Sequence, residues 1–221
     1  MPGHYERLSY RDNSFLALES RTTPMHVAAI AMGEAAPLRT ATGGIDTDRI
    51  RRLVESKLHM IPRYRQRLAR VPIEKHPVWV DDEHFNLEYP VRHYSLPRPG
   101  SFEQLKDLVG IIMSQQLDRS KPLWEFNIVE GLEGDEFAII SKIHHCMIDG
   151  IAGVDLMAVL LNLAPSDVID EPAPFVARAE PSGSELLVRE TARRTGRALG
   201  AMRSVRQLTD DANEIVKSGV H

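Results

Sequence analysis

Two apolar segments joined by a short polar loop limit the folds open to this chain more than any other part of its sequence. Residues 124–129 and 136–144 have the pattern of strands, and residues 130–135 between them form a glycine-containing hairpin loop. A helix of small and apolar residues is predicted at 151–163, directly after the second strand. Residues 25–32 predict another strand that is apolar on both faces, which requires cover on both sides. We therefore expect an α/β fold in which helices flank a sheet.

Other helix starts are marked by polar side chains that can accept hydrogen bonds from free backbone N–H groups. These starts are Ser9 or Asp12 for a helix through Leu18, about Thr47 for a second helix, and Ser101 with Gln104, a capping box, for a third. Pro62 ends or kinks the second helix. Short strands are expected at 78–80 and 86–91.

The composition of the chain changes after residue 163. Residues 164–184 are rich in proline and poor in large apolar side chains, which predicts a linker. From residue 185 to about residue 217 the chain has one long helical pattern. We expect a domain at 1–163, a linker at 164–184 and a long crossover helix at 185–221.

Leucines and arginines alternate around the 185–221 helix, and this mixture has two interpretations. A basic amphipathic helix can lie on an anionic membrane or a lipid-droplet surface. Alternatively, the helix crosses to a second domain and packs against it. The linker before the helix favours packing, because a proline-rich spacer gives the helix reach to another domain. The small residues at 191–200 favour it too, because they offer little apolar area to lipid.

Charge and cysteine content exclude several classes of protein. The net charge of −4 argues against a nucleic-acid-binding protein. The single cysteine, Cys146, excludes an intramolecular disulfide and a CxxC zinc site, and suits a reducing compartment. The longest apolar runs, 27–32 and 156–161, are far shorter than the ~18 residues of a membrane span. Since the N-terminus also lacks an apolar signal core, we expect a cytoplasmic protein, or one on a membrane surface reached from that side.

The side chains best suited to catalysis lie at 143–150, where the second strand leads to the 151–163 helix. Successive strand residues point to opposite faces, so His144 and His145 cannot easily ligate one metal ion. A histidine at this position can act as a general base, because imidazole accepts a proton near neutral pH. The alternative is a histidine whose hydrogen bonds are satisfied within the fold, which is its usual role at a strand end.

His144, His145, Asp149 and Gly150 form an HHxxxDG pattern. This pattern resembles the motif of the acyltransferases related to chloramphenicol acetyltransferase and to peptide-synthetase condensation domains. Four blocks, in the same order along the chain, resemble bacterial wax ester synthase/diacylglycerol acyltransferases more closely. These blocks are Leu8–Leu16 with Thr23–Val27, Pro62–Leu68, Asp118–Glu125 with its PLW element, and His144–Gly150. The resemblance covers residues 8–163.

The resemblance implies a chloramphenicol-acetyltransferase-like fold with a mixed sheet flanked by helices. It implies that His145 is the general base, that His144 and Gly150 support it, and that Asp149 holds the turn through an ion pair with an arginine. The implied reaction joins a long-chain acyl group from acyl-CoA, a co-substrate, to a fatty alcohol or a diacylglycerol, without a cofactor or a metal. Since family members carry a second, similar domain, we expect this chain to be the N-terminal half. The missing C-terminal half would be its partner and would supply part of the oxyanion stabilisation.

Several residue assignments stay open at this stage. Cys146 could be a nucleophile, but strand alternation favours an inert thiol that points away from the base. Arg63, Arg65 and Arg67 could contact CoA phosphates, lie on a solvated turn or supply the arginine partner of the motif aspartate. Trp124 could line a substrate tunnel or belong to the core.

Three classes of function remain. They are a lipid-forming acyltransferase, another HHxxxDG enzyme with a carrier-bound donor, and a non-catalytic half that needs its partner domain. The TPMHV and PLW segments favour the first class over the second, and the intact His145 and Asp149 argue against a degenerate protein. The expected location is the cytoplasm, with the inner membrane or lipid inclusions as a peripheral site.

Overall fold

The computed structural model describes residues 3–148, 168–196, 200, 202 and 204. The helix predicted at 151–163 and the last part of the predicted crossover helix, residues 205–221, lie outside the described residues. Of the helices within the described residues, none has both the length and the apolar character that crossing a membrane would require.

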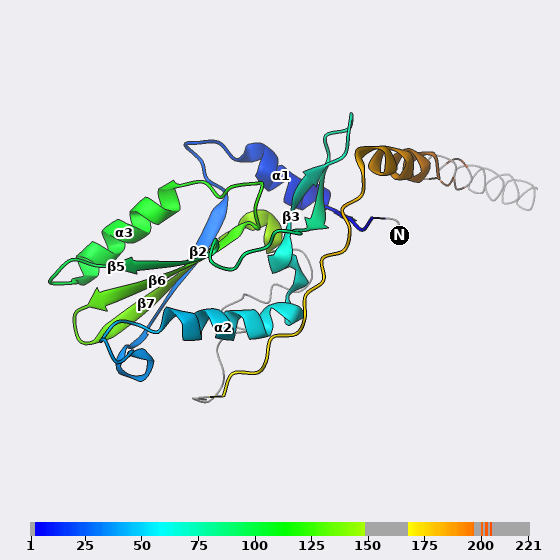
Figure 1. Ribbon diagram of the computed structural model, residues 1–221. Coiled ribbons are helices and arrows are strands. Elements are labelled where there is room, and N and C mark those ends of the chain that lie inside the picture. Colours follow the sequence, from blue (N-terminus) through cyan, green and yellow to red (C-terminus); the bar gives the residue numbers. More distant parts are fainter. Residues whose placement is uncertain (1–2, 149–167, 197–199, 201, 203, 205–221) are drawn as a thin grey trace, which may run out of the picture.

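The largest element is a four-stranded mixed sheet with helices on both faces (Figure 1). Its strands, in spatial order, are β2 (His26–Glu34), β7 (Glu136–His144), β6 (Trp124–Leu132) and β5 (Val91–Ser95). Strand β7 pairs antiparallel with both β2 and β6, whereas β5 pairs parallel with β6. Helix α3 (Phe102–Ser114) covers one face, and α2 (Thr47–Lys57) lies on the other. The predicted mixed sheet flanked by helices is confirmed.

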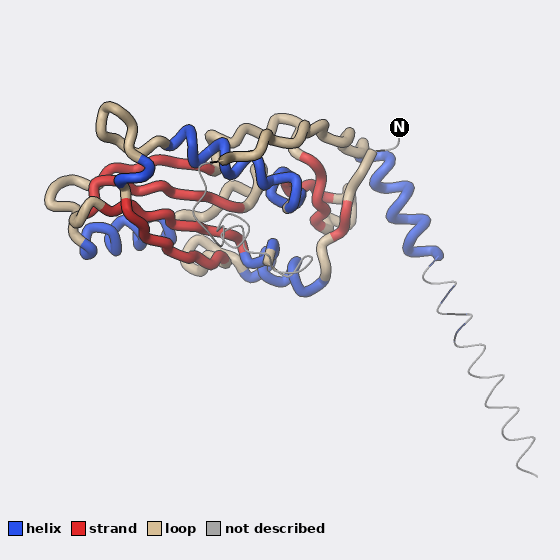
Figure 2. The backbone as a smooth tube through the Cα atoms, turned by 90° about the horizontal axis from the view of Figure 1, so that it is seen from below, coloured by secondary structure: helices blue, strands red, loops and turns tan. Residues whose placement is uncertain are grey.

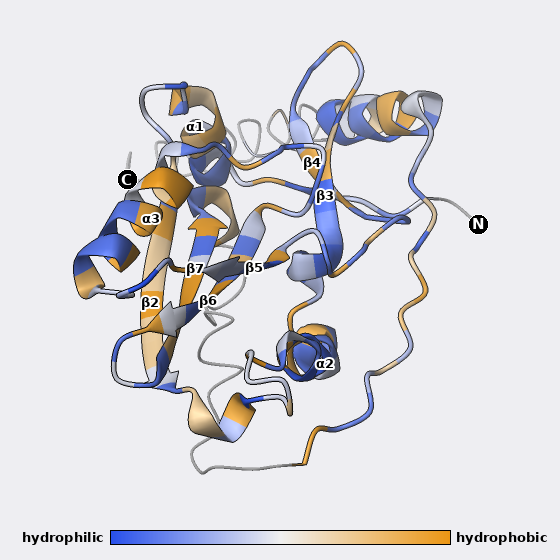
Figure 3. Ribbon diagram, turned by 60° about the vertical axis from the view of Figure 1, so that its left-hand side comes forward, coloured by the Kyte–Doolittle hydropathy of each residue, from blue (hydrophilic) through white to orange (hydrophobic). Residues whose placement is uncertain are grey.

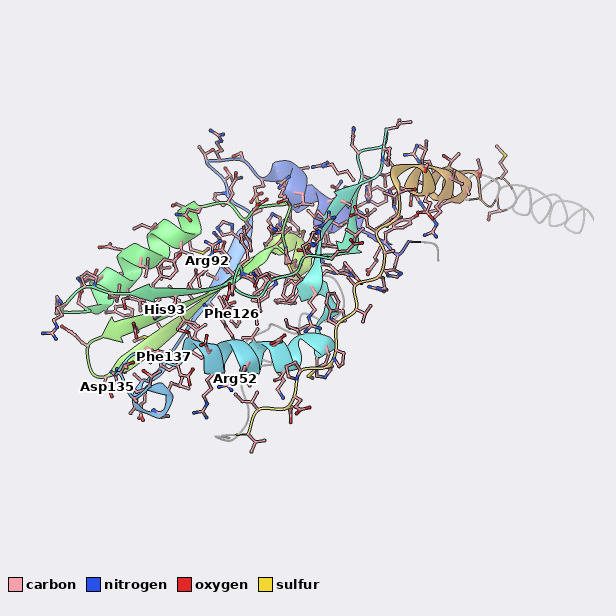
Figure 4. All side chains as sticks on the ribbon, viewed as in Figure 1. Arg52, Arg92, His93, Phe126, Asp135 and Phe137 are labelled. Carbon is pink, nitrogen blue, oxygen red and sulfur yellow. The ribbon has the colours of Figure 1, made fainter. Side chains whose placement is uncertain are left out.

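Side-chain alternation along β6 and β7 divides the buried residues between two cores. On one face, Ala138 and Ile140 of β7 pack with Leu105 and Ile112 of α3. On the other face, Phe126 of β6 is fully buried in the core that α2 completes (Figure 4). Burying a large apolar side chain in this way stabilises a fold by about 1.5–3 kcal/mol. Both faces of the two central strands are therefore covered, as their apolar sequence requires.

The helix starts follow the capping residues in the sequence. Helix α1 (Tyr10–Leu18) is capped by Ser9, whose Oγ accepts the N–H of Asp12 at 3.0 Å. Of the two candidate caps, Ser9 is therefore the correct one. The capping box of Ser101 and Gln104 at α3 is confirmed. Short 3₁₀ helices occur at η1 (Ala36–Leu38), η2 (Leu58–Met60) and η3 (Pro62–Arg65).

The prediction that the strand at 25–32 is covered on both sides is wrong. Strand β2 lies at the edge of the sheet, and Val27, Ile30 and Met32 are each more than one third exposed. Among the described residues, the core beneath α3 contains side chains of β6 and β7 and none of β2. The strand is rich in alanine and glycine, whose side chains bury little area. An apolar sequence of this kind therefore does not show that both faces of the strand are covered.

The strand predicted at 86–91 is also wrong, because β5 begins only at Val91. Tyr89 N–H donates to Asn86 O at 3.2 Å and closes a turn there. Pro90 has no N–H to donate to a strand ladder. Pairing with β6 can therefore start only after the proline.

A second, smaller sheet contains β1 (Glu6–Arg7), β4 (Pro77–Asp81) and β3 (Gln66–Arg70), all antiparallel. Strand β4 confirms the strand predicted at 78–80. Strand β3 is not predicted by the sequence, since its arginine-rich pattern is typical of a solvated turn. It forms because it pairs along its whole length with β4, every residue of which is buried.

Residues 168–182 have no regular structure and run along the domain as an extended strap (Figures 1 and 2). The main anchor is Arg178, whose guanidinium donates to both oxygens of the buried Asp81 carboxylate, at 2.7 and 2.8 Å. The backbone N–H of Arg178 donates to the same carboxylate at 3.0 Å. Two more ion pairs hold the strap, namely Glu180 with Arg67 and Asp170 with Lys57.

A helix follows the strap, and residues 183–196 of it are described. The helix begins at residue 183, two residues before the predicted start at residue 185. Leu186 packs with Val78 of β4, and the buried Glu190 accepts a hydrogen bond from Tyr5 Oη at 2.9 Å. The first turns of this helix therefore pack on the three-stranded sheet of the same domain.

Replacing Arg178 with methionine should loosen the strap, because the buried Asp81 carboxylate loses its cationic partner. We expect the free energy of unfolding to fall by about 1–3 kcal/mol. Proteolysis within residues 168–182 should become faster at the same time. The control is Arg52→Met, since Arg52 is an exposed residue of α2 (Figure 4). Cleavage at the wild-type rate in Arg178→Met would contradict an ionic anchor.

Candidate active site

The candidate site lies where β7 ends and the 3₁₀ helix η4 (His145–Met147) begins, next to α1 (Figure 3). The backbone N–H of His145 donates to Met25 O at 2.8 Å, which fixes the chain at the start of η4. The ring of His145 stacks on Phe15 of α1, with centroids 4.1 Å apart and planes 13° from parallel. His145 is half-buried, and its Nδ1 is a buried atom without a hydrogen-bond partner among the described residues. One side of the ring is therefore packed.

His144, the last residue of β7, has different neighbours. Its side chain is fully buried, and its Nδ1 accepts the N–H of Cys146 at 3.1 Å. Because Nδ1 is an acceptor, the ring proton lies on Nε2, which is 3.5 Å from Glu19 Oε1. The two histidine rings thus have separate neighbours: the carboxylate of Glu19 approaches His144 without forming a hydrogen bond, and Phe15 stacks on His145.

Glu19 is a buried carboxylate whose hydrogen bonds are well satisfied. Arg119 donates to its Oε2 from Nε at 3.2 Å and from a terminal nitrogen at 2.8 Å. The N–H of Met25 donates to its Oε1 at 3.2 Å. Burial alone would raise the pKa of Glu19, but the hydrogen bonds from Arg119 and Met25 and the nearby His144 hold that pKa below its usual value. The group therefore stays ionised.

Burial lowers the pKa of His144 to about 4, because the charged ring would lose its hydration. The carboxylate of Glu19 opposes this effect without overcoming it. His144 is therefore neutral at neutral pH, with one proton in a fixed position. A buried ring of this kind is suited to holding the turn rather than to exchanging protons with a substrate.

Cys146 is almost completely buried, and burial raises the pKa of its thiol well above its ordinary value. The thiol therefore stays protonated at neutral pH. This favours the interpretation of Cys146 as an inert structural residue over that of a nucleophile.

The three arginines of the 62–68 block have contacts within the domain. Arg63 pairs with Glu6 at 2.8 Å. The buried Arg65 stacks on the ring of Phe175 in the strap, and Arg67 pairs with Glu180 of the strap. A contact of these arginines with CoA phosphates stays a prediction.

Trp124 is fully buried at the start of β6 and donates from Nε1 to Tyr64 O at 2.8 Å. It also packs edge-on against Phe126. These contacts belong to the core, and a contact of Trp124 with substrate stays a prediction. Asp149 and Gly150 lie outside the described residues, so their predicted roles also stay predictions.

The sequence interpretation missed four residues of the site, namely Phe15, Glu19, Met25 and Arg119. Phe15, Met25 and Arg119 lie inside the resembling blocks 8–16, 23–27 and 118–125, so position within a block was the available signal. Nothing in the local pattern marks Glu19 as buried. Across residues 3–148 and 168–196, no three His, Cys, Asp or Glu side chains gather in a way that could hold a metal ion.

Residues 8–221 match the family described as the wax ester synthase/diacylglycerol acyltransferase catalytic domain. Among curated relatives, the probable diacylglycerol O-acyltransferase tgs3 of Mycobacterium tuberculosis is 34% identical, over 96% of this chain and 79% of its own length. The O-acyltransferase WSD of Acinetobacter baylyi is 37% identical, over 66% of this chain and 30% of its own length.

A solved wax ester synthase/diacylglycerol acyltransferase from Marinobacter aquaeolei superposes with a TM-score of 0.54 at 33% identity. The match covers 66% of this chain and 34% of that chain. The starter condensation domain of rhizomide synthetase also superposes, with a TM-score of 0.54 at 11% identity, which is a likeness of fold alone. The predicted chloramphenicol-acetyltransferase-like fold is thereby confirmed.

The buried His144 should make the protein less stable as the pH falls from about 6.5 toward 4. The unfolded chain takes up a proton on this ring near pH 6.5, whereas the folded protein does so only near its pKa of about 4. The contribution of His144 to the free energy of unfolding should change by at most about 1.4 kcal/mol per pH unit. The free energy of unfolding should be measured by urea unfolding at several pH values in this window. It should depend less steeply on pH in His144→Gln than in the wild type. Equal slopes would contradict a neutral, buried ring.

The thiol of Cys146 should be protected in the folded protein. Iodoacetamide at about pH 8 should alkylate it slowly under native conditions and rapidly in denaturant, because only unfolding exposes the sulfur and permits thiolate formation. Mass spectrometry of the alkylated protein measures both rates. Native labelling as fast as labelling in denaturant would contradict the buried placement.

Proposed function

The chain belongs to the wax ester synthase/diacylglycerol acyltransferase family, and on this basis we propose that it provides the catalytic histidine of a long-chain O-acyltransferase. The proposed donor is acyl-CoA. The proposed acceptor is a fatty alcohol, which gives a wax ester, or a diacylglycerol, which gives a triacylglycerol. The names of the relatives from M. tuberculosis and A. baylyi support an O-acyl transfer.

In this proposal His145 is the general base. It takes the proton of the acceptor hydroxyl while the oxygen attacks the thioester carbonyl carbon. The C–S bond then breaks, and His145 returns the proton to the departing CoA thiolate. An acyl-enzyme is unnecessary because the thioester is already activated, so the reaction needs acyl-CoA only as a co-substrate.

The observation that carries the assignment is the environment of the His145 ring. Phe15 packs against one ring face, and the buried Nδ1 points into the protein. Of the two nitrogens of the His145 ring, we therefore assign Nε2 as the one that accepts the proton of the acceptor hydroxyl. The neighbouring His144 is unsuited to this role, since its side chain is buried and its Nδ1 already accepts a hydrogen bond.

The proposal extends to the partner and the location of the protein. Relatives that are longer than this chain motivate a second domain that forms the other wall of the site and supplies an oxyanion donor. We place the enzyme in the cytoplasm, peripherally at the inner membrane or at lipid inclusions, because both proposed acceptors are lipids. The cluster at Arg63–Arg67 is the proposed place to look for CoA contacts.

Release of CoA should be measured with a fatty alcohol, a diacylglycerol and a carrier-linked amine as acceptors. Turnover with either lipid supports the proposal and defines the acceptor. Turnover with the amine alone would favour a condensation-type enzyme. Turnover that appears only after a C-terminal half is added would mean that this half needs its partner for catalysis.

His145→Ala should lower kcat by about 10²–10⁴-fold without changing the fold, because the general base is lost. His144→Ala should lower it less, since that ring supports the turn without reaching the substrate. His84→Ala is the control, because His84 is an exposed loop residue. Circular dichroism confirms folding, and CoA release measures kcat. Wild-type turnover in His145→Ala would overturn the assignment.

A further inference from the structure

Glu19 is connected to both histidines by three separate routes, although it lies more than 100 residues before them. Its side chain is 1% exposed, and it sits at the end of α1. A carboxylate so deeply buried destabilises a fold unless its partners are in place. The partners that offset this cost therefore show which parts of the site the carboxylate holds.

The first route is through the ring of His145. The backbone N–H of Glu19 donates to Phe15 O at 3.1 Å and ends α1 at this residue. Phe15 stacks directly on the His145 ring at 4.1 Å. The end of α1 thus sets the position of the aromatic face against which the histidine lies.

The second route is through the backbone of His145. Glu19 Oε1 accepts the N–H of Met25 at 3.2 Å, and Met25 O accepts the N–H of His145 at 2.8 Å. A tight reversal between these residues, in which Ser20 and Thr23 exchange both backbone hydrogen bonds, brings Met25 back to the Glu19 side chain. A shift of the carboxylate would therefore be transmitted to the residue that anchors His145.

The third route is through His144. Glu19 Oε1 is 3.5 Å from Nε2 of that ring, while Nδ1 accepts the N–H of Cys146, the second residue of η4. The ring therefore lies between the carboxylate and the turn that carries His145, with a hydrogen bond to the turn and a close approach without a hydrogen bond to the carboxylate. Arg119, from the block that contains the PLW element, fixes Oε2 with two hydrogen bonds and completes the arrangement.

We propose that Glu19, held by Arg119, is a positioning residue that keeps the ring and backbone of His145 in the orientation required for acyl transfer. This inference rests on the proposed function of His145. It assigns Glu19 no contact with the substrate. Displacement of a catalytic group by about 1 Å can reduce a rate by about 100-fold, so loss of this support should act mainly on kcat.

The chain offers a closely matched control for Glu19→Gln. Glu190 is also a buried glutamate, with a side chain 3% exposed, and it pairs with Arg7 and Arg193. It lies beside the three-stranded sheet, in contact with Tyr5. Glu190→Gln therefore removes a carboxylate of the same kind and burial without touching the histidines.

Glu19→Gln should lower kcat by about 10–100-fold and leave KM within about twofold, whereas Glu190→Gln should lower the melting temperature without changing kcat. Arg119→Lys is a milder second variant, with an expected loss of a few-fold in kcat. Wild-type kcat in both Glu19→Gln and Arg119→Lys, or an equal loss of kcat in Glu190→Gln, would overturn the inference.

Hydrogen exchange of the His145 amide, measured by NMR, tests the positioning without any substrate. This amide should exchange faster in Glu19→Gln, and at the wild-type rate in Glu190→Gln, because Glu19, unlike Glu190, accepts the N–H of Met25. Faster exchange in a protein that transfers no acyl group would support the positioning and overturn only the proposed function. Unchanged exchange in Glu19→Gln would overturn the positioning itself.

Discussion

The antiparallel pairing of β2 with β7 is the constraint on which the arrangement of the site depends. The register places His26 opposite His144, so Met25 lies beside the first residue of η4 and accepts its N–H. A slip of one residue would turn the side chains of β7 to the other face of the sheet. His144 would then leave Glu19, and the two cores on either side of the sheet would exchange their apolar residues.

A row of buried polar side chains continues from this site along the face of the sheet covered by α3. Lys142 Nζ donates to Ile112 O at 2.7 Å, at the C-terminal end of α3 where backbone carbonyls lack helical partners. His26 is also within 2.7 Å of Met113 O in the same helix turn. A buried lysine and a half-buried histidine that bind the end of one helix fix its position relative to the sheet. The polar row thus provides specificity at a site where apolar packing alone would allow the helix to slide.

The strap and the described first turns of the helix after it, residues 168–196, pack on the domain that carries the site. Arg178 and Glu180 pair with residues of the three-stranded sheet, and Phe175 stacks on Arg65. A proline-rich composition indicates a lack of regular structure, and the strap indeed contains no helix or strand. Composition does not indicate whether such a segment is docked, because docking depends on single ionic contacts to residues far away in sequence.

The sequence by itself determined the elements whose signals are local. Ser9 and Ser101 cap their helices, alternation places β6 and β7 in a covered sheet, and the HHxxxDG pattern with three other blocks indicates the family. Sequence patterns failed where the outcome depends on neighbouring segments. Strand β2 is an edge strand with exposed side chains, β5 begins only after Pro90, and β3 exists because β4 pairs with it.

Only the tertiary structure decided which residues surround His145. Glu19 and Arg119 are separated by 100 residues, and no periodicity or capping rule links them. Their pairing follows from strand register and helix packing, which bring the ends of α1 and β7 together with the loop before β6. Local patterns fix the conformation of each segment, whereas the hydrogen bonds that hold a buried carboxylate must come from whichever segments the fold places beside it.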